Sequence, residues 1–107
     1  MKEQVQQFRI GIERPGRLHH GLEVVDCEVL DLTEKGLQLR THAAVRVGEM
    51  VQLDVMLDSC QSARCALVVT YLRAPYVGGR IVSMSPEHKA RLVSFLERSI
   101  IDHVVGF

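Results

Sequence analysis

The chain has no excess charge of either sign. Its 107 residues include 13 Lys and Arg and 13 Asp and Glu, so the formal net charge is zero. General nucleic-acid binders owe their affinity to an excess of basic residues. The composition therefore argues against a nucleic-acid polymer as the partner, although a few local arginines can still hold a small anion.

Long apolar runs are also missing. No stretch approaches the roughly 20 apolar residues that a membrane-spanning helix needs, so we expect no direct insertion into a membrane. The N-terminal sequence MKEQVQQF is too polar for a signal peptide. These two absences predict a cytoplasmic protein.

Cysteine is scarce, and metal-ligand clusters are absent from the pattern. Cys27, Cys60 and Cys65 are too few and too unevenly spaced for a disulfide framework or a cysteine-rich zinc site. We interpret them as reduced thiols. His19 and His20 are adjacent, so on a strand they would face opposite ways, and their simplest interpretation is a solvated hairpin loop. The sequence predicts neither a metal site nor a cofactor.

The usual motifs of active sites do not occur either. There is no GxSxG, no HExxH and no phosphate-binding glycine loop followed by Lys and Ser or Thr. We therefore expect a protein that is not an enzyme. Tyr71 and Tyr76 are interpreted as packing residues and not as platforms on which a base could stack.

What the sequence does contain is an alternation of apolar and polar residues, which predicts short strands over its first two thirds. The alternation is cleanest at 50–57, where Val51, Leu53, Val55 and Leu57 would face inward. Further strands are expected at 8–12, 23–31, 36–41, 64–72 and 80–84. The sequences RPGR (14–17) and APYVGG (74–79) are typical of turns.

The period changes after residue 84. Ser85 suits the N-cap of a helix, Pro86 its first position and Glu87 its positive end. Apolar residues then recur every three or four positions, which predicts a C-terminal helix over 86–105. Several short antiparallel strands followed by one helix indicate a mostly β protein, with a small barrel or a sandwich as its architecture.

The sequence DLTEKG (31–36) resembles the [D/N]xSxxG signature of PilZ domains, with Thr33 in the serine position. Two later segments, VGEMVQLDV (47–55) and GGRIVSMSPEHKARLVSFL (78–96), are similar to that family in order and spacing. The resemblance covers nearly the whole chain. It implies a six-stranded antiparallel β-barrel with a C-terminal α-helix.

As a PilZ-like protein, the chain would form a single domain over 1–107, with a flexible N-terminal segment at 1–8. Many PilZ domains bind the bacterial second messenger cyclic di-GMP, which carries two phosphates and two guanines. Others do not bind it and act only through protein partners, notably in type IV pilus assembly.

The resemblance implies a set of ligand-binding residues. Asp31 would accept hydrogen bonds from the N–H edge of guanine, Thr33 would add a hydroxyl contact, and Gly36 would permit a positive φ and leave room for the ligand. Arg9 corresponds to the second arginine of the family's RxxxR motif. There it would grip a phosphate or stack on a guanine.

The RxxxR motif is only half present, because Val5 stands where the first arginine would be. Arg14 and Arg17 offer an alternative pair, but they are separated by three positions instead of four and lie too close to Asp31 in the sequence. A lost charge-assisted contact costs about 1.5–3 kcal/mol, or about tenfold to a hundredfold in affinity.

Two functions are consistent with this pattern. The first is a single-domain cyclic di-GMP receptor or adaptor that signals through an unidentified effector protein, as a monomer or a homodimer. The alternative is a degenerate PilZ protein that does not bind the dinucleotide and acts as an interaction module in type IV pilus or motility control. The intact 31–36 signature favours the first function, and Val5 favours the second. Taken alone, residues 31–36 would simply form a turn capped by Thr33.

Overall fold

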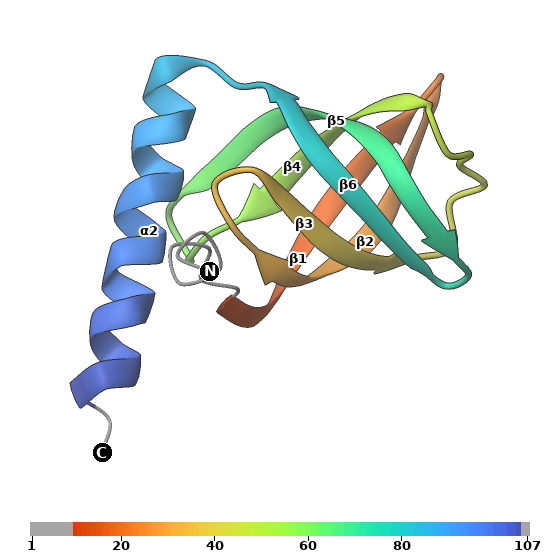
Figure 1. Cartoon of the computed structure of the whole chain (residues 1–107). Coiled ribbons are helices and arrows are strands. Elements are labelled where there is room, and N and C mark those ends of the chain that lie inside the picture. Colours follow the sequence, from red (N-terminus) through yellow and green to blue (C-terminus); the bar gives the residue numbers. More distant parts are fainter. Residues whose placement is uncertain (1–9, 106–107) are drawn as a thin grey trace.

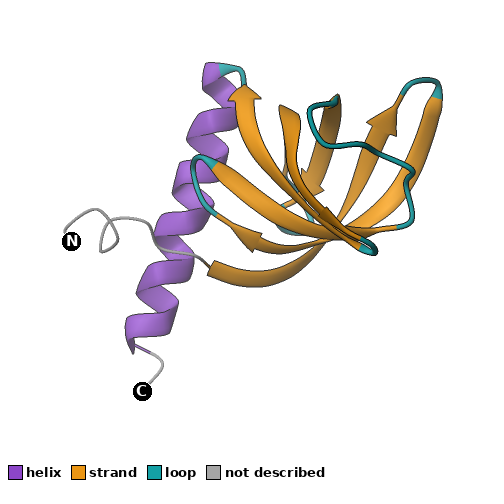
Figure 2. Ribbon diagram, turned by 45° about the vertical axis from the view of Figure 1, so that its right-hand side comes forward, coloured by secondary structure: helices purple, strands orange, loops and turns teal. Residues whose placement is uncertain are grey.

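The computed structural model describes residues 10–105 as a closed antiparallel barrel with one long helix against it (Figures 1 and 2). The elements are β1 (Ile10–His20), β2 (Glu23–Leu32), β3 (Gly36–Thr41), β4 (Met50–Met56), β5 (Ser62–Arg73), β6 (Tyr76–Ser83) and α2 (Pro86–Val105). Around the barrel the strands follow the order β1-β2-β3-β6-β5-β4, and β4 pairs with β1 to close it. The six-stranded barrel with a C-terminal helix is thus confirmed. The segment 1–8, expected to be flexible, lies outside the described residues.

The barrel interior is filled by the apolar residues of the alternating strands. Val51, Leu53, Val55 and Leu57 are all buried, as the pattern predicts. Leu53 on β4 pairs with Leu18 on β1, and both side chains are completely buried. The contact between these two leucines therefore packs the seam at which the barrel closes.

The first strand is longer than the sequence pattern suggests, and the turn predicted at 14–17 is wrong. Those residues lie within β1 and pair with β2. The register of this pair shifts between Gly11 and Arg14, just before the sequence RPGR, and is regular through 14–17. Pro15 is tolerated because β1 pairs with β4 only over 16–19, which leaves the proline at an edge. The chain turns instead at Gly21, whose φ is 63°.

The two adjacent histidines are not in a solvated loop but end β1. The Nε2 atom of His19 lies 3.1 Å from Oδ2 of Asp54, and Nε2 of His20 lies 2.8 Å from Oε2 of Glu49. Asp54 also accepts a hydrogen bond of 2.6 Å from Nε of Arg64. The bonds from Arg64 and, to a smaller extent, from His19 hold the pKa of Asp54 below its ordinary value. These contacts tie β1 to β4 and β5 on the outside of the closing seam.

The turn predicted at 74–79 is also wrong beyond its first two residues. β6 begins at Tyr76, and Gly78 and Gly79 lie inside it, paired with β3 on one side and β5 on the other. Glycines weaken a strand unless another group must come close to its backbone. That requirement is met here, where β6 forms one wall of a pocket.

The helix α2 begins where its capping residues predict. The backbone N–H of His88 donates to Oγ of Ser85 at 3.2 Å, and the N–H of Lys89 donates to the Ser85 carbonyl at 2.8 Å. Leu92 and Leu96 are buried where the helix packs against β5 and β1. Figure 1 shows α2 at one end of the barrel, away from the tip of the β1–β2 hairpin. Within the described part of the chain, no helix is long and apolar enough to cross a membrane.

We expect Leu53→Ala to reduce the free energy of unfolding by about 2–5 kcal/mol, because it leaves a cavity beside Leu18 at the closing seam. Leu22→Ala is the matched control, since the Leu22 side chain is fully exposed. That change should stay within about 0.5 kcal/mol. Urea unfolding of the three proteins measures both effects, and equal losses in the two variants would contradict this view of the core.

Candidate functional site

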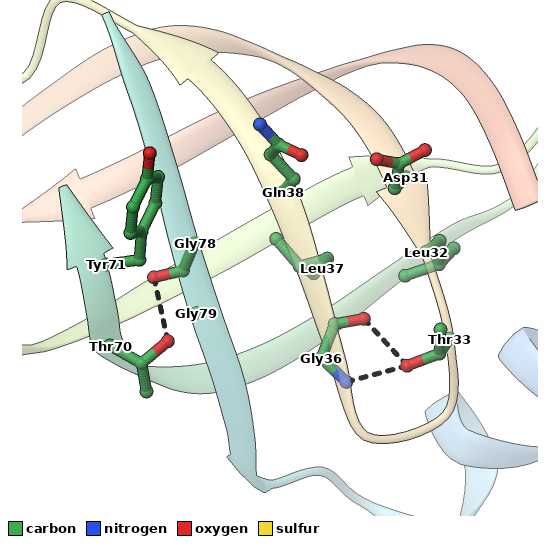
Figure 3. Close-up of a pocket in the computed structure, with 10 residues that line it drawn as sticks. All are labelled: Asp31, Leu32, Thr33, Gly36, Leu37, Gln38, Thr70, Tyr71, Gly78 and Gly79. Atoms are coloured by element: carbon green, nitrogen blue, oxygen red, sulfur yellow. Dashed lines mark hydrogen bonds between the residues drawn. The ribbon is translucent and has the colours of Figure 1, made fainter. Parts of the chain in front are cut away.

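A short turn at residues 33–36 joins β2 to β3, and the Thr33 hydroxyl closes it (Figure 3). Oγ1 of Thr33 accepts hydrogen bonds from the backbone N–H groups of Lys35 at 3.1 Å and Gly36 at 3.0 Å. It donates to the Gly36 carbonyl at 3.0 Å, and the Thr33 N–H donates to the same oxygen at 2.9 Å. The hydroxyl is therefore fully engaged in holding the turn, as is typical of Ser and Thr in such positions.

Gly36 lets the turn lie directly against β6. A Cβ atom at Gly36 would come within 2.7 Å of the Gly79 carbonyl oxygen, which is too close for any side chain. The N–H of Ile81 donates to the Lys35 carbonyl at 2.7 Å and fixes the turn to β6. The φ of Gly36 is not positive, so the sequence-based expectation of a positive φ is wrong. The expectation that glycine is needed for space is supported by this geometry.

Beside this turn lies a pocket of about 540 Å³. Its walls come from β2, β3, β5 and β6, and the three predicted residues Asp31, Thr33 and Gly36 all line it (Figure 3). Sequence spacing placed these three residues on one turn. The contribution of β5 and β6 was not predicted from the sequence. Their lining residues are more than thirty positions from Gly36, and the sequence assigned Gly78 and Gly79 to a turn and Tyr71 to packing.

A row of paired residues on four neighbouring strands lies along the open side of the pocket. Asp31 pairs with Gln38, Gln38 with Gly78, and Gly78 with Tyr71. The side chains of Asp31, Gln38 and Tyr71 extend to the same side of the sheet (Figure 3). Gly78 contributes no side chain to the row, and a Cβ there would lie only 3.1 Å from Cβ of Tyr71. The missing side chain leaves a hollow between Gln38 and Tyr71.

The polar groups around this hollow are available to a ligand. Within the part of the chain whose side chains the structure describes, those of Asp31, Gln38 and Tyr71 have no hydrogen-bond partner. Tyr71 is 47% exposed, so its interpretation as a packing residue is wrong. The pocket offers a carboxylate acceptor, an amide and an aromatic ring around a floor of glycine.

Comparison with known proteins places this architecture in a family. A model of the PilZ domain matches residues 3–98. The chain belongs to the PilZ domain family. No curated protein matches the chain significantly, so solved structures supply the relatives of this PilZ domain.

Three solved structures share the fold. The Bacillus subtilis inhibitor of motility MotI (DgrA) has a TM-score of 0.76 at 11% identity, covering 91% of this chain and 51% of that one. Escherichia coli YcgR in complex with cyclic di-GMP has a TM-score of 0.70 at 18% identity, covering 92% and 48%. The PilZ domain of YcgR with cyclic di-GMP gives 0.68 at 14%, covering 92% and 95%. This PilZ chain thus spans about half the length of the MotI and YcgR chains.

The structure brings neither of the two predicted arginines that it describes to the pocket of Asp31. Arg9 and Val5 lie outside the described residues. The alternative pair lies elsewhere on this PilZ barrel: Nε of Arg14 donates to the Met56 carbonyl at 2.9 Å, and Arg17 lines a separate pocket with Asp54. Neither Arg14 nor Arg17 lines the pocket of Asp31.

Metal and thiol chemistry find no support in the described residues. No group of three or more His, Cys, Asp or Glu side chains is arranged there to hold a metal ion. Burial raises the pKa of the Cys27 and Cys65 thiols to about 12, so both stay protonated and unreactive at neutral pH. Cys60 is exposed on the loop after β4.

The structure assigns the Thr33 hydroxyl to the turn, and a matched pair of variants tests this assignment. Thr33→Ser keeps the hydroxyl and should leave the free energy of unfolding within about 0.5 kcal/mol. Thr33→Val keeps the shape but removes the hydrogen bonds to Lys35 and Gly36, and should cost about 1–3 kcal/mol. Equal stability of the two variants in urea unfolding would show that the hydroxyl does not hold the turn.

Proposed function

We propose that this PilZ domain is a single-domain bacterial receptor or adaptor that binds cyclic di-GMP in the Asp31 pocket and signals through contact with an effector protein. One observation carries the proposal. A glycine-floored pocket on a PilZ barrel presents Asp31, Gln38 and Tyr71 without partners among the described side chains. The solved YcgR structures that share this fold contain cyclic di-GMP.

Each group of the pocket has a role that suits a guanine nucleotide. The Asp31 carboxylate accepts hydrogen bonds from the N–H edge of guanine, and the Gln38 amide can donate or accept beside it. The exposed ring of Tyr71 offers a face on which a base stacks. Gly36 and Gly78 keep the backbone accessible. Thr33 belongs to the site through the turn, since its hydroxyl already makes three hydrogen bonds.

Arg9 remains the proposed phosphate contact on the N-terminal side. Its guanidinium would form paired hydrogen bonds with one phosphate or lie against a guanine. Attachment of Arg9 to the bound ligand would draw the N-terminal segment to the pocket and change the surface that an effector meets. In this proposal the protein works by contact in the cytoplasm, as an adaptor that catalyses no reaction.

A second function has its own support. Val5 in place of an arginine, together with a Thr33 hydroxyl that is already satisfied, favours a PilZ domain that has lost ligand binding and acts only as an interaction module. Such a protein would contribute to type IV pilus or motility control through protein partners. MotI, which shares the fold, is an inhibitor of motility.

Calorimetric titration with cyclic di-GMP tests the first function, with Asp31→Ala as the site variant. We expect saturable binding by the natural protein and a loss of about tenfold to a hundredfold in Asp31→Ala, because a hydrogen bond to a charged group is removed. Asp26→Ala is the matched control. Asp26 is an exposed β2 carboxylate that also has no partner among the described side chains and lies outside this pocket.

The possible outcomes separate the two functions. Both variants should keep their thermal melting, because neither carboxylate makes a hydrogen bond or an ion pair with another described side chain. Absence of heat and of a thermal shift with the natural protein at high ligand concentration would favour the interaction module. Binding that Asp31→Ala leaves unchanged would move the ligand to another part of the surface.

A further inference from the structure

The described residues give the pocket no cation. Those that line it include the Asp31 carboxylate but no Lys, Arg or His side chain, whereas a cyclic dinucleotide carries two negatively charged phosphates. A dianion placed beside an unpaired carboxylate is repelled unless positive charge lies close by. If the proposed function is correct, positive charge must therefore come from Arg9, from the residues around the pocket, or from both.

Of the nine arginines that the structure describes, four have side chains that make hydrogen bonds or ion pairs with other groups of the chain: Arg14, Arg40, Arg64 and Arg91. Arg40 lies on β3, which also carries Gly36 and Gln38, and its guanidinium forms an ion pair with Glu28. Arg80 on β6 is exposed and has no partner among the described side chains.

Arg80 is fixed at the edge of the pocket by its backbone. It pairs with Gly36 across β3 and β6, and a Cβ at Gly36 would lie 3.6 Å from Cα of Arg80. The next residue, Ile81, donates its N–H to the Lys35 carbonyl of the turn. The strand at Arg80 is thus held against the turn while the side chain is left free.

Two of the positions beside Arg80, on the face that it shares with the pocket, are glycines. Along β6, Gly78 stands two residues away on the same face, about 7 Å along the strand. Across the strand, Gly36 is directly opposite. The glycines along its own strand and on β3 leave space for the Arg80 guanidinium on the side of the hollow, while on β5 its neighbour is Val68.

We propose that Arg80 is a phosphate-binding residue of this site, which supplies from the barrel the positive charge that the pocket lining lacks. Its planar guanidinium presents several N–H donors in a fork that matches two phosphate oxygens. Lys35, on the turn, is another cation without a described partner, but an ammonium group offers no such fork. The inference rests on the proposed function and adds to Arg9 a second phosphate contact, on β6.

The test compares Arg80→Gln with Arg17→Gln in calorimetric titrations of the full chain with cyclic di-GMP. Arg17 is also exposed, and two strands separate β1 from β6 in either direction around the barrel. Both variants remove one positive charge, but only Arg80→Gln removes a charge at the pocket. We expect Arg80→Gln to weaken binding about tenfold to a hundredfold and Arg17→Gln to leave it unchanged.

A third variant, Arg80→Lys, separates the forked contact from the charge alone. It should bind with an affinity between those of the natural protein and Arg80→Gln, with thermal melting unchanged in all three variants. Binding by the natural protein that Arg80→Gln leaves intact would overturn the assignment of Arg80. Equal weakening in Arg80→Gln and Arg17→Gln would also overturn it, because it would show an effect of net charge only. No binding by the natural protein would instead refute the proposed function on which the inference rests.

Discussion

The turn between β2 and β3 lies against β6 with no space for a side chain between them. A Cβ at Gly36 would overlap the Gly79 carbonyl oxygen. Two residues further along β6, the N–H of Ile81 donates a hydrogen bond to the Lys35 carbonyl. The Thr33 hydroxyl holds the turn in the shape that this contact requires. Because β6 joins β3 to β5 in the barrel, the position of the turn and the path of the sheet are fixed by the same close approach.

The pocket follows from that constraint. Glycine at 36 permits the close contact, glycine at 78 removes the side chain that would otherwise fill the outer face, and the space left between them is bordered by Asp31 and Tyr71. Four strands and the 33–36 turn therefore hold the described groups of the candidate site, and Arg9 lies outside the described residues. Arg80 lies on the same strand as Gly78, so one element positions both the proposed charge and the glycine wall of the cavity.

The sequence predicted what depends on local pattern and missed what depends on distant strands. The alternation at 50–57 and the cap at Ser85 are local, and both elements form where they were expected. The glycines of 78–79 were assigned to a turn, because only the position of β3 shows that they are needed for close approach. Tyr71 was assigned to packing, because the sequence does not show the register shift in β5 that changes which residues face outward. The 31–36 signature located one wall of the pocket, but not the wall formed by β5 and β6.

Backbone amide NMR during a titration with cyclic di-GMP would show whether the face around Gly36 and Gly78 receives the ligand. We expect the largest shift changes on amides of the 33–36 turn, Gln38 and residues 78–80, with little change along β1. Changes centred on the separate pocket of Arg17 and Asp54, or none at saturating ligand, would contradict this expectation.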